Sequence, residues 1–229
     1  MDLSRQELIL GEKSKKLENS KICIVGIGAL GSLSAELLVR SGVKSLTIID
    51  RDTIEDSNLQ RQHLFTKEDI DKPKVEIAKN YLKKINPDIN ITTHFKKLEK
   101  ENINLIDSDL VLDCTDNFEI RFLINEYCKK NNIPWIFSAA IRNIGYVYNI
   151  LPDSPCFNCI FQKLKSTEIC STAGVLNTIT SLISSLQISE AIKILTNSNS
   201  EKNLLFIDLS NNQFHKIRIN KRKDCEICN

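Results

Sequence analysis

A glycine-rich turn near the amino terminus constrains the fold of this chain more than any other feature. The apolar run 21–25 is followed at once by Gly26-Ile-Gly28-Ala-Leu-Gly31, and a helical pattern opens after it. Asp50 ends the next apolar run, at about the 20-residue spacing expected of an acid that binds a ribose hydroxyl. This order predicts a nucleotide-binding loop, because backbone N–H groups at a helix amino terminus bind phosphate. The alternatives are tight strand–helix packing without a ligand and a surface Asp that closes a strand.

Strand and helix patterns alternate over the first two thirds of the chain. We expect strands near 21–25, 45–50, 89–95, 109–113 and 134–139, and helices near 29–41, 73–85 and 119–131. This order predicts an α/β fold with a Rossmann-like, doubly wound, mainly parallel sheet. The carboxyl ends of parallel strands lie at one edge of such a sheet. The glycine turn, Asp50 and the segment Asp113–Asp116 should therefore converge there.

The rest of the chain has a different character, although we expect residues 1–229 to form a single domain. A strand is expected near 144–151, a loop from 152 to about 172, a long helix near 175–196 and two strands, 204–208 and 214–219, as an antiparallel extension. The predicted divisions are a helical lead-in at 1–20, a nucleotide-binding core at 21–150 and a carboxyl-terminal part at 151–229.

A polar, cationic segment follows Asp50 and argues for a triphosphate. Asn58 and Arg61 come soon after this acid, and Lys74 follows Pro73 at a predicted helix start. A cation in the first helical turn opposes the helix dipole, and that cost makes sense if an anion lies nearby. Hydride transfer has no use for such a segment. The alternative is that each is an ordinary solvated surface residue.

Two carboxylates, Asp113 and Asp116, follow the apolar strand at 110–112. Carboxylates at a strand end are suited to Mg²⁺, a hard cation that prefers oxygen ligands. Asp116 and Asn117 also suit an Asx turn that caps the next helix. The two interpretations are compatible.

Charge and hydropathy exclude several classes of protein. Lys and Arg number 31 against 29 Asp and Glu, a balance that argues against a dedicated nucleic-acid binder. The amino terminus lacks the apolar segment of a signal peptide, and no run approaches the roughly 18 apolar residues of a membrane helix. We therefore expect a cytoplasmic protein, or one made inside an organelle, with reduced cysteines.

The eight cysteines include two CxxC pairs, Cys156-Phe-Asn-Cys159 and Cys225-Glu-Ile-Cys228. In a reducing compartment this pattern predicts a structural Cys₄ zinc site, here one that staples the carboxyl-terminal tail to the domain. A redox pair and unrelated surface cysteines are the alternatives. Cys170 lies outside both pairs, and its loop context fits either a reactive thiol or inert loop filling.

The order and spacing of these motifs resemble the ThiF/MoeB/HesA family, bacterial relatives of ubiquitin-activating enzymes. The resemblance covers nearly the whole chain. The motifs that carry it are Ser4-Arg5-Gln6, Gly26–Gly31, Asp50-Arg-Asp52, Asn58–Gln62, Lys72-Pro-Lys74, Asn86-Pro87, Asp113–Asn117, Cys170-Ser-Thr-Ala-Gly174 and both CxxC pairs. Leu64–Ile70 and the Cys170 motif favour the thiamine branch (ThiF-like) over the molybdopterin branch.

The resemblance implies ATP-dependent adenylylation of the carboxyl-terminal glycine of a small ubiquitin-like sulfur-carrier protein that ends in Gly-Gly. The activated carrier would enter thiocarboxylate formation in thiamine or molybdopterin biosynthesis, with sulfur from a separate persulfide donor. The implied site residues fall into four groups. Gly26, Gly28, Gly31, Asp50, Asp52, Asn58, Arg61 and Lys74 would bind ATP, Asp116 would bind Mg²⁺, Arg5 would reach into the partner's site of a homodimer, and Cys170 would form covalent sulfur-transfer intermediates.

The chemistry of adenylylation agrees with this set of residues. A carboxylate nucleophile with a pKa of about 3.3–3.7 needs no general base at neutral pH, and the three His residues show no catalytic spacing. Two other functions compete with this interpretation. An NAD(P)-dependent oxidoreductase would use the glycine turn and Asp50 but leave Lys74 and the CxxC pairs without a role. A non-catalytic, zinc-stapled scaffold that binds a ubiquitin-like protein would not need Arg61, Lys74 and Asp116.

Overall fold

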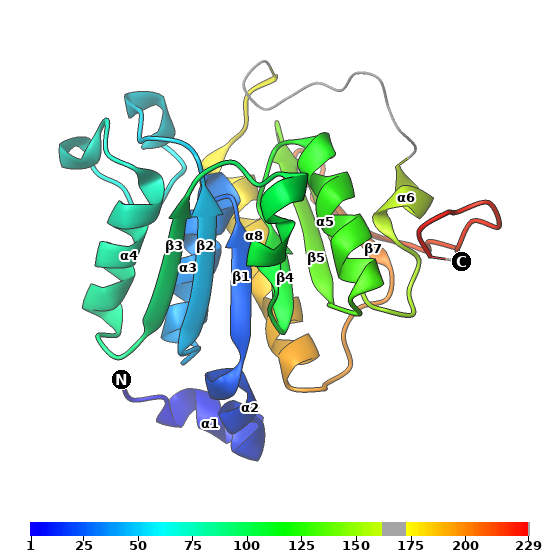
Figure 1. Ribbon diagram of the computed structural model, residues 1–229, viewed down its shortest axis with the longest axis horizontal. Helices are drawn as coiled ribbons and strands as arrows, with labels where there is room; N and C mark the ends of the chain where they lie inside the picture. The colour runs from blue at the N-terminus through cyan, green and yellow to red at the C-terminus, as the bar shows by residue number, and fades with distance from the viewer. Residues whose placement is uncertain (162–172, 229) are drawn as a thin grey trace.

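The computed structural model describes residues 1–161 and 173–228 (Figure 1). Its α-helices are α1 (Ser4–Leu10), α2 (Ser14–Asn19), α3 (Ala29–Arg40), α4 (Lys74–Ile85), α5 (Phe118–Lys130), α6 (Phe157–Ile160) and α8 (Asn177–Leu195). Its strands are β1 (Lys21–Val25), β2 (Ser45–Asp50), β3 (Asn90–Phe95), β4 (Leu110–Asp113), β5 (Trp135–Ile141), β6 (Ile144–Ile150), β7 (Leu204–Asp208) and β8 (Gln213–Ile217). Short 3₁₀ helices are η1 (Gly11–Lys13), η2 (Asp56–Asn58), η3 (Lys67–Asp69) and η4 (Lys100–Ile106).

The eight strands of residues 1–161 and 173–228 form one sheet, in the order β3-β2-β1-β4-β5-β6-β7-β8. Strands β1 to β5 pair with one another in parallel, and the pairs β5–β6, β6–β7 and β7–β8 are antiparallel. The predicted doubly wound, mainly parallel sheet with an antiparallel extension is thus confirmed. In this order β1 has β2 on one side and β4 on the other. The chain therefore turns in opposite directions from β1, which is where α/β sheets open a ligand-binding crevice.

The central strand β1 is buried on both faces, as parallel strands covered by helices usually are. Ile22 and Ile24 belong to the apolar cluster under α3, α4 and α8, whereas Cys23 and Val25 belong to the cluster under α5 and η4. Figure 1 shows α3 and α8 behind the sheet and α5 in front of it. Because successive side chains of a strand point to opposite faces, this short apolar run fills both layers.

The long helix α8 packs on α3, β5 and β6 and buries polar side chains among its apolar ones. Thr180, Ser184, Gln187 and Glu190 are at most 4 % exposed. These residues interrupt the apolar run in the sequence because the helix makes buried hydrogen bonds. Among the described residues, no helix is both long and apolar enough to cross a bilayer.

Most predicted elements begin and end within two residues of the observed ones, with one exception. The segment from 152 to 172, predicted as a loop, contains the one-turn helix α6. Cys156 is the N-cap of this helix and Cys159 lies within it. The short turn was missed because it has no room for an amphipathic pattern.

Candidate functional site

A pocket of about 920 Å³ opens at the carboxyl ends of β1, β2 and β4. Its polar lining comes from the segments that follow these strands and from the start of α4. The lining includes most of the residues predicted to bind ATP or Mg²⁺, namely Gly26, Gly28, Asp50, Asp52, Asn58, Arg61, Lys74 and Asp116. Apolar side chains, among them Phe118, Phe137 and Phe161, also line it. The convergence predicted from strand order is therefore present in the structure.

The three glycines at the junction of β1 and α3 lack side chains for two different reasons. Gly26 has φ +89°, and a Cβ on it would lie 2.8 Å from the Cys114 carbonyl oxygen. A Cβ on Gly31 would lie 2.0 Å from the Gly26 oxygen, so close packing requires both glycines. A Cβ on Gly28 would meet only the Gln62 amide nitrogen, at 3.7 Å. Packing alone does not require Gly28, and its bare backbone leaves this part of the pocket open to a phosphate.

Asp50 ends β2 and is held by backbone N–H groups on both sides. Its carboxylate accepts hydrogen bonds from Ile27 N at 2.7 Å and from Asp52 N at 2.8 Å. Burial raises the pKa of Asp50, and these two N–H groups oppose the rise. The carboxylate is thus fixed beside the glycine turn, where an acid can accept a ribose hydroxyl.

Lys74 is the best-placed cation of the pocket. It begins α4 and is only 6 % exposed. Its Nζ lies 3.5 Å from Asp52 Oδ2, a carboxylate whose side chain is 57 % exposed. Arg61 donates from Nη1 to the Ser57 oxygen at 2.8 Å. Both cations line the pocket, and a buried ammonium with one long ion pair has donors left for an anionic ligand.

Asn58 is buried, and part of its amide serves the local fold. Its Oδ1 accepts the Glu55 N–H at 3.2 Å, which completes a capping box around η2. Its Nδ2 donates to Ser57 Oγ at 3.3 Å. Asn58 therefore has a structural role in the local fold in addition to its predicted contact with phosphate.

The two carboxylates at the end of β4 lie in different surroundings, which corrects the expectation that both face one Mg²⁺ site. Asp113 is fully buried, and its carboxylate accepts hydrogen bonds from Arg121 Nε at 3.0 Å and Thr115 N at 3.0 Å. Burial raises the pKa of Asp113, and the Arg121 guanidinium opposes this rise. Asp116 is exposed and lines the pocket. The predicted helix cap is Asn117, whose Oδ1 accepts the Ile120 N–H at 3.2 Å.

The predicted residue Arg5 is not part of this pocket. Arg5 lies on α1, which Figure 1 shows beyond the amino-terminal ends of the strands, at the opposite edge of the sheet. Gln6 on the same helix donates to the Ser41 oxygen at 2.8 Å, at the far end of α3 from the glycine turn. Arg5 therefore does not serve the pocket of its own chain. Cys170 lies outside the described residues.

Two pocket residues were not singled out from the sequence. Gln62 is 5 % exposed, and its Oε1 has no hydrogen-bond partner among the described residues. Leaving a buried acceptor unpaired costs about 1–3 kcal/mol, so a ligand donor would be favoured there. Arg121 is 5 % exposed, and its guanidinium carbon lies 5.0 Å from the Phe137 ring centre. Its partner Asp113 is distant enough in sequence that spacing alone does not reveal the pair.

The four cysteines of the CxxC pairs form a second centre, beside α6 and the carboxyl terminus (Figure 1). Cys156 Sγ lies 3.5 Å from Cys225 Sγ and 4.0 Å from Cys159 Sγ. Cys159 Sγ lies 3.4 Å from Cys228 Sγ, and all four sulfurs lie within 4.8 Å of one another. Tetrahedral zinc with Zn–S bonds of about 2.3 Å places its ligands about 3.8 Å apart. The donor set and its spacing therefore fit zinc.

The surroundings hold this cysteine cluster in shape. Asn125 of α5 is fully buried, accepts the Phe157 N–H at 3.0 Å and donates to Asn158 Oδ1 at 2.9 Å, which fixes the turn between Cys156 and Cys159. Burial opposes ionisation of Cys225, yet backbone N–H groups of its own knuckle lower its pKa to about 7. A thiol that ionises near neutrality is a ready metal ligand.

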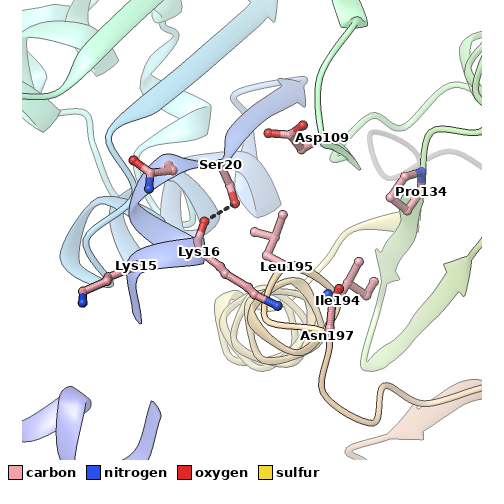
Figure 2. A pocket seen from close by; sticks show the side chains of 9 residues that line it. Lys15, Lys16, Ser20, Asp109, Pro134, Ile194, Leu195 and Asn197 are labelled. Atoms are coloured by element: carbon pink, nitrogen blue, oxygen red, sulfur yellow. Dashed lines mark hydrogen bonds between the residues drawn. The ribbon is translucent and has the colours of Figure 1, made fainter. Parts of the chain in front are cut away.

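A second hollow of about 560 Å³ lies near the end of α8 (Figure 2). Figure 2 shows Lys16 and Ser20 of the lead-in facing Ile194 and Leu195, with Ser20 Oγ donating to the Lys16 oxygen at 2.7 Å. Asp109, also part of the lining, comes just before β4. The hollow therefore lies at the end of the sheet away from the nucleotide pocket, and none of the predicted site residues is among the described residues that line it.

Comparison with known proteins agrees with the geometry. The model of the ThiF family matches residues 3–227. This chain belongs to the ThiF family. The sulfur carrier protein ThiS adenylyltransferase of Bacillus subtilis is 38% identical over 224 residues, which cover 94% of this chain and 67% of that protein. The molybdopterin-synthase adenylyltransferase of Escherichia coli is 34% identical over 235 residues, covering 98% and 94%.

A solved structure of this type is that of E. coli MccB with ATP. It superimposes with a TM-score of 0.87 at 23% identity, over 99% of this chain and 74% of that one. At this identity the likeness shows the fold alone. The predicted family and the predicted nucleotidyltransferase class are confirmed by the two ThiF-family relatives.

Proposed function

We propose that this protein adenylylates the carboxyl-terminal glycine of a small ubiquitin-like sulfur carrier with ATP. The observation that carries the proposal is the convergence of Asp50, Lys74, Arg61 and Asp116 on one pocket beside a bare glycine turn. The names of the relatives supply the substrate class. A carrier of the ThiS type is favoured over one of the molybdopterin type.

The reaction joins a carboxylate oxygen to the α-phosphorus of ATP and releases pyrophosphate. The nucleophile is already ionised at neutral pH, so the protein needs to align it and to stabilise negative charge. Lys74 and Arg61 supply that charge stabilisation, and Asp50 accepts the ribose hydroxyls. One well-placed donor of this kind contributes about 10²–10³ in rate. The buried position of Lys74 increases its effect, because water screens it less.

Two metals belong to the proposal. Asp116 is the carboxylate of the pocket rim that would hold Mg²⁺, and the ion would neutralise charge on the transferring phosphates. Asp113 is excluded from this role by its pairing with Arg121. The cysteine cluster would hold zinc, which would stabilise the carboxyl-terminal part of the fold without entering the reaction.

The proposed assembly is a homodimer in which Arg5 completes the partner's pocket. Leu8 and Ile9 on the same helix are 80 % and 87 % exposed, and α1 buries none of its residues in its own chain. Exposed apolar neighbours on one short helix are typical of a surface covered by another chain. A cation on this helix would then lie against a second copy.

Mixing two inactive variants tests this arrangement. Arg5→Ala and Lys74→Met homodimers should each lose most ATP–pyrophosphate exchange. Subunit exchange between them should restore activity, because each mixed dimer contains one pocket with both cations. If the mixture stays as inactive as its components, Arg5 does not act across the dimer.

The central experiment is ATP–pyrophosphate exchange with candidate carriers. Exchange should require a carrier that ends in Gly-Gly, and the same carrier lacking its last glycine is the matched control. A ThiS-type carrier should support faster exchange than a molybdopterin-type carrier. Tight NAD binding without carrier-dependent exchange would instead establish an oxidoreductase.

Cys170 is proposed to act after adenylylation. Its thiolate would attack the acyl carbon of the carrier adenylate, forming a thioester as the bond to AMP breaks. The outer sulfur of a separate persulfide donor would then displace the Cys170 thiolate from this thioester, and a thiol reductant would cleave the resulting acyl disulfide to give the carrier thiocarboxylate and a disulfide. Cys170→Ser should keep pyrophosphate exchange near that of the unsubstituted protein and reduce carrier thiocarboxylate, measured by mass spectrometry. Full thiocarboxylate yield from the variant would contradict this role.

A further inference from the structure

Gln187 of α8 lies beneath the nucleotide pocket and is fully buried. Its Nε2 donates to Ser138 Oγ at 2.8 Å and to the Asp113 carbonyl oxygen at 3.2 Å. Its Oε1 accepts from Ser34 Oγ at 2.8 Å and from Cys114 Sγ at 3.4 Å. An amide has two donors and two acceptor positions. All four are used here, so the orientation of this side chain is completely determined.

One of these contacts, the hydrogen bond from Ser34, reaches the phosphate-binding side of the pocket. Ser34 lies on α3, the helix that begins directly after the glycine turn. One turn before Gln187 on α8, Ser184 Oγ donates to the Leu30 oxygen of α3 at 3.0 Å. Helix α8 thus holds α3 at two points, and α3 carries the glycine turn.

The contacts with Asp113 and Cys114 reach the side of the pocket that carries Asp116. The Asp113 carbonyl accepts from both Gln187 Nε2 and Ser138 Oγ, the latter at 2.8 Å. The Asp113 carboxylate is held from the opposite direction by Arg121. Asp113 is therefore fixed through both its backbone and its side chain, and Asp116 follows three residues later in the same turn.

We propose that Gln187 is a positioning residue for adenylylation, whose amide sets the glycine turn and the Asp113–Asn117 turn at a fixed separation. This inference rests on the proposed function. A polar network in the interior that is fully satisfied is rigid, because every alternative arrangement leaves a buried group unpaired. A ligand held between two turns needs that rigidity, since a shift of about 1 Å in alignment can cost about 10²-fold in rate.

Gln187→Met tests the inference, because it keeps the length of the side chain and removes all four hydrogen bonds. Carrier-dependent ATP–pyrophosphate exchange should fall by about 10² in kcat, with little change in KM for ATP. Half-maximal exchange should also need more Mg²⁺, because Asp116 is displaced from the phosphates. Exchange by the unsubstituted protein is measured alongside. If the unsubstituted protein shows no exchange, the proposed function is wrong. A loss of exchange in the variant alone bears only on the role of Gln187.

Glu190→Gln is the matched control on the same helix. Glu190 is 4 % exposed and accepts from Asn149 Nδ2 and Glu201 N, each at 2.7 Å, away from the pocket. Both variants should lower the free energy of unfolding in urea, but only Gln187→Met should change kcat and the Mg²⁺ requirement. If kcat per folded chain is the same in both variants, Gln187 has a structural role only and the inference is overturned.

Smaller substitutions keep the test decisive if Gln187→Met does not fold. Ser34→Ala removes the hydrogen bond from α3 to Gln187. Ser138→Ala removes the hydrogen bond from Gln187 to β5 and one of the two donors to the Asp113 carbonyl. Each should lower kcat by a smaller factor than Gln187→Met and raise the Mg²⁺ requirement. Full kcat in both variants would overturn the inference.

Discussion

The nucleotide pocket and the cysteine cluster both gather residues that are far apart in sequence, but different forces assemble them. The pocket forms where the parallel strands end, so the sheet brings Asp50, Lys74 and Asp116 together before any ligand is present. The cysteine cluster joins a turn after β6 to a tail after β8, and its four sulfurs lie within 4.8 Å of one another. Sheet pairing determines the first site, and metal binding would determine the second.

Because of this difference, we expect a single substitution to affect either catalysis or stability, depending on the region in which it lies. A pocket residue such as Lys74 can change with little effect on folding, because the strands and helices around it remain packed. A cysteine of the cluster can change with little effect on chemistry, because it lies outside the nucleotide pocket. Three measurements would break or sharpen this comparison.

The largest effect is expected from Lys74→Met, which removes the charge and keeps most of the aliphatic chain. ATP–pyrophosphate exchange should fall by about 10²–10³. The free energy of unfolding should change little, because within the described part of the chain Lys74 has a single long ion pair, with the half-exposed Asp52. Lys84→Met, at an exposed position in the last turn of the same helix, is the control. If Lys74→Met instead lost much stability and kept normal exchange, Lys74 would have a structural role and not a catalytic one.

A smaller effect, on stability alone, is expected from Cys228→Ser. The purified protein should contain one zinc per chain, and the variant should lose it. The loss in unfolding free energy should be about 2.7 kcal/mol where free zinc exceeds Kd a hundredfold. Chelation should lower the stability of the unsubstituted protein but not that of the variant. Glu226→Ser, an exposed position in the same knuckle, should retain the metal.

A metal-free protein of unchanged stability would show that cysteine packing, and not zinc, holds the tail. Metal content measured by elemental analysis and urea unfolding distinguish the two cases directly.

The smallest effect concerns acid stability of the antiparallel end. Glu201 Oε2 lies 2.6 Å from Lys216 Nζ of β8, and this hydrogen bond, with others from Asn203, lowers the pKa of Glu201 from 4.5 to about 2. A carboxyl group with a lowered pKa stabilises the fold above pH 4.5, and this contribution is lost as the pH falls from there toward 2. Glu201→Gln should therefore flatten the dependence of unfolding free energy on pH in this window.

Lys216→Met should flatten the same window by removing the partner of Glu201, and Lys202→Met should not. The effect should be modest, because the ammonium of Lys216 is largely exposed and screened by solvent. If Glu201→Gln leaves the pH dependence of the unfolding free energy unchanged, this ion pair does not contribute to the stability of the antiparallel end.

The sequence predicts those parts of the two regions that follow from short-range rules. Asp50 and the glycine turn are recognisable because strand, turn and helix are consecutive, and the CxxC pairs because the spacing within each pair is local. Arg121 and Gln187 are not recognisable in this way, since their roles depend on partners that only the folded sheet brings near. The expected pairing of Asp113 with Asp116 fails for the same reason, because spacing does not reveal which carboxylate points inward.

Strand β8 ends the sheet of the described residues and has a consequence for solubility. All five of its residues are exposed, with Phe214 at 62 % and Ile217 at 42 %. An edge strand of this kind can template pairing with strands of other molecules, which leads to aggregation. Lys216 lies on this edge between the two apolar side chains, and a lysine there is a common defence against such pairing. At high protein concentration the charge of Lys216 is therefore expected to oppose such pairing, in addition to its ion pair with Glu201.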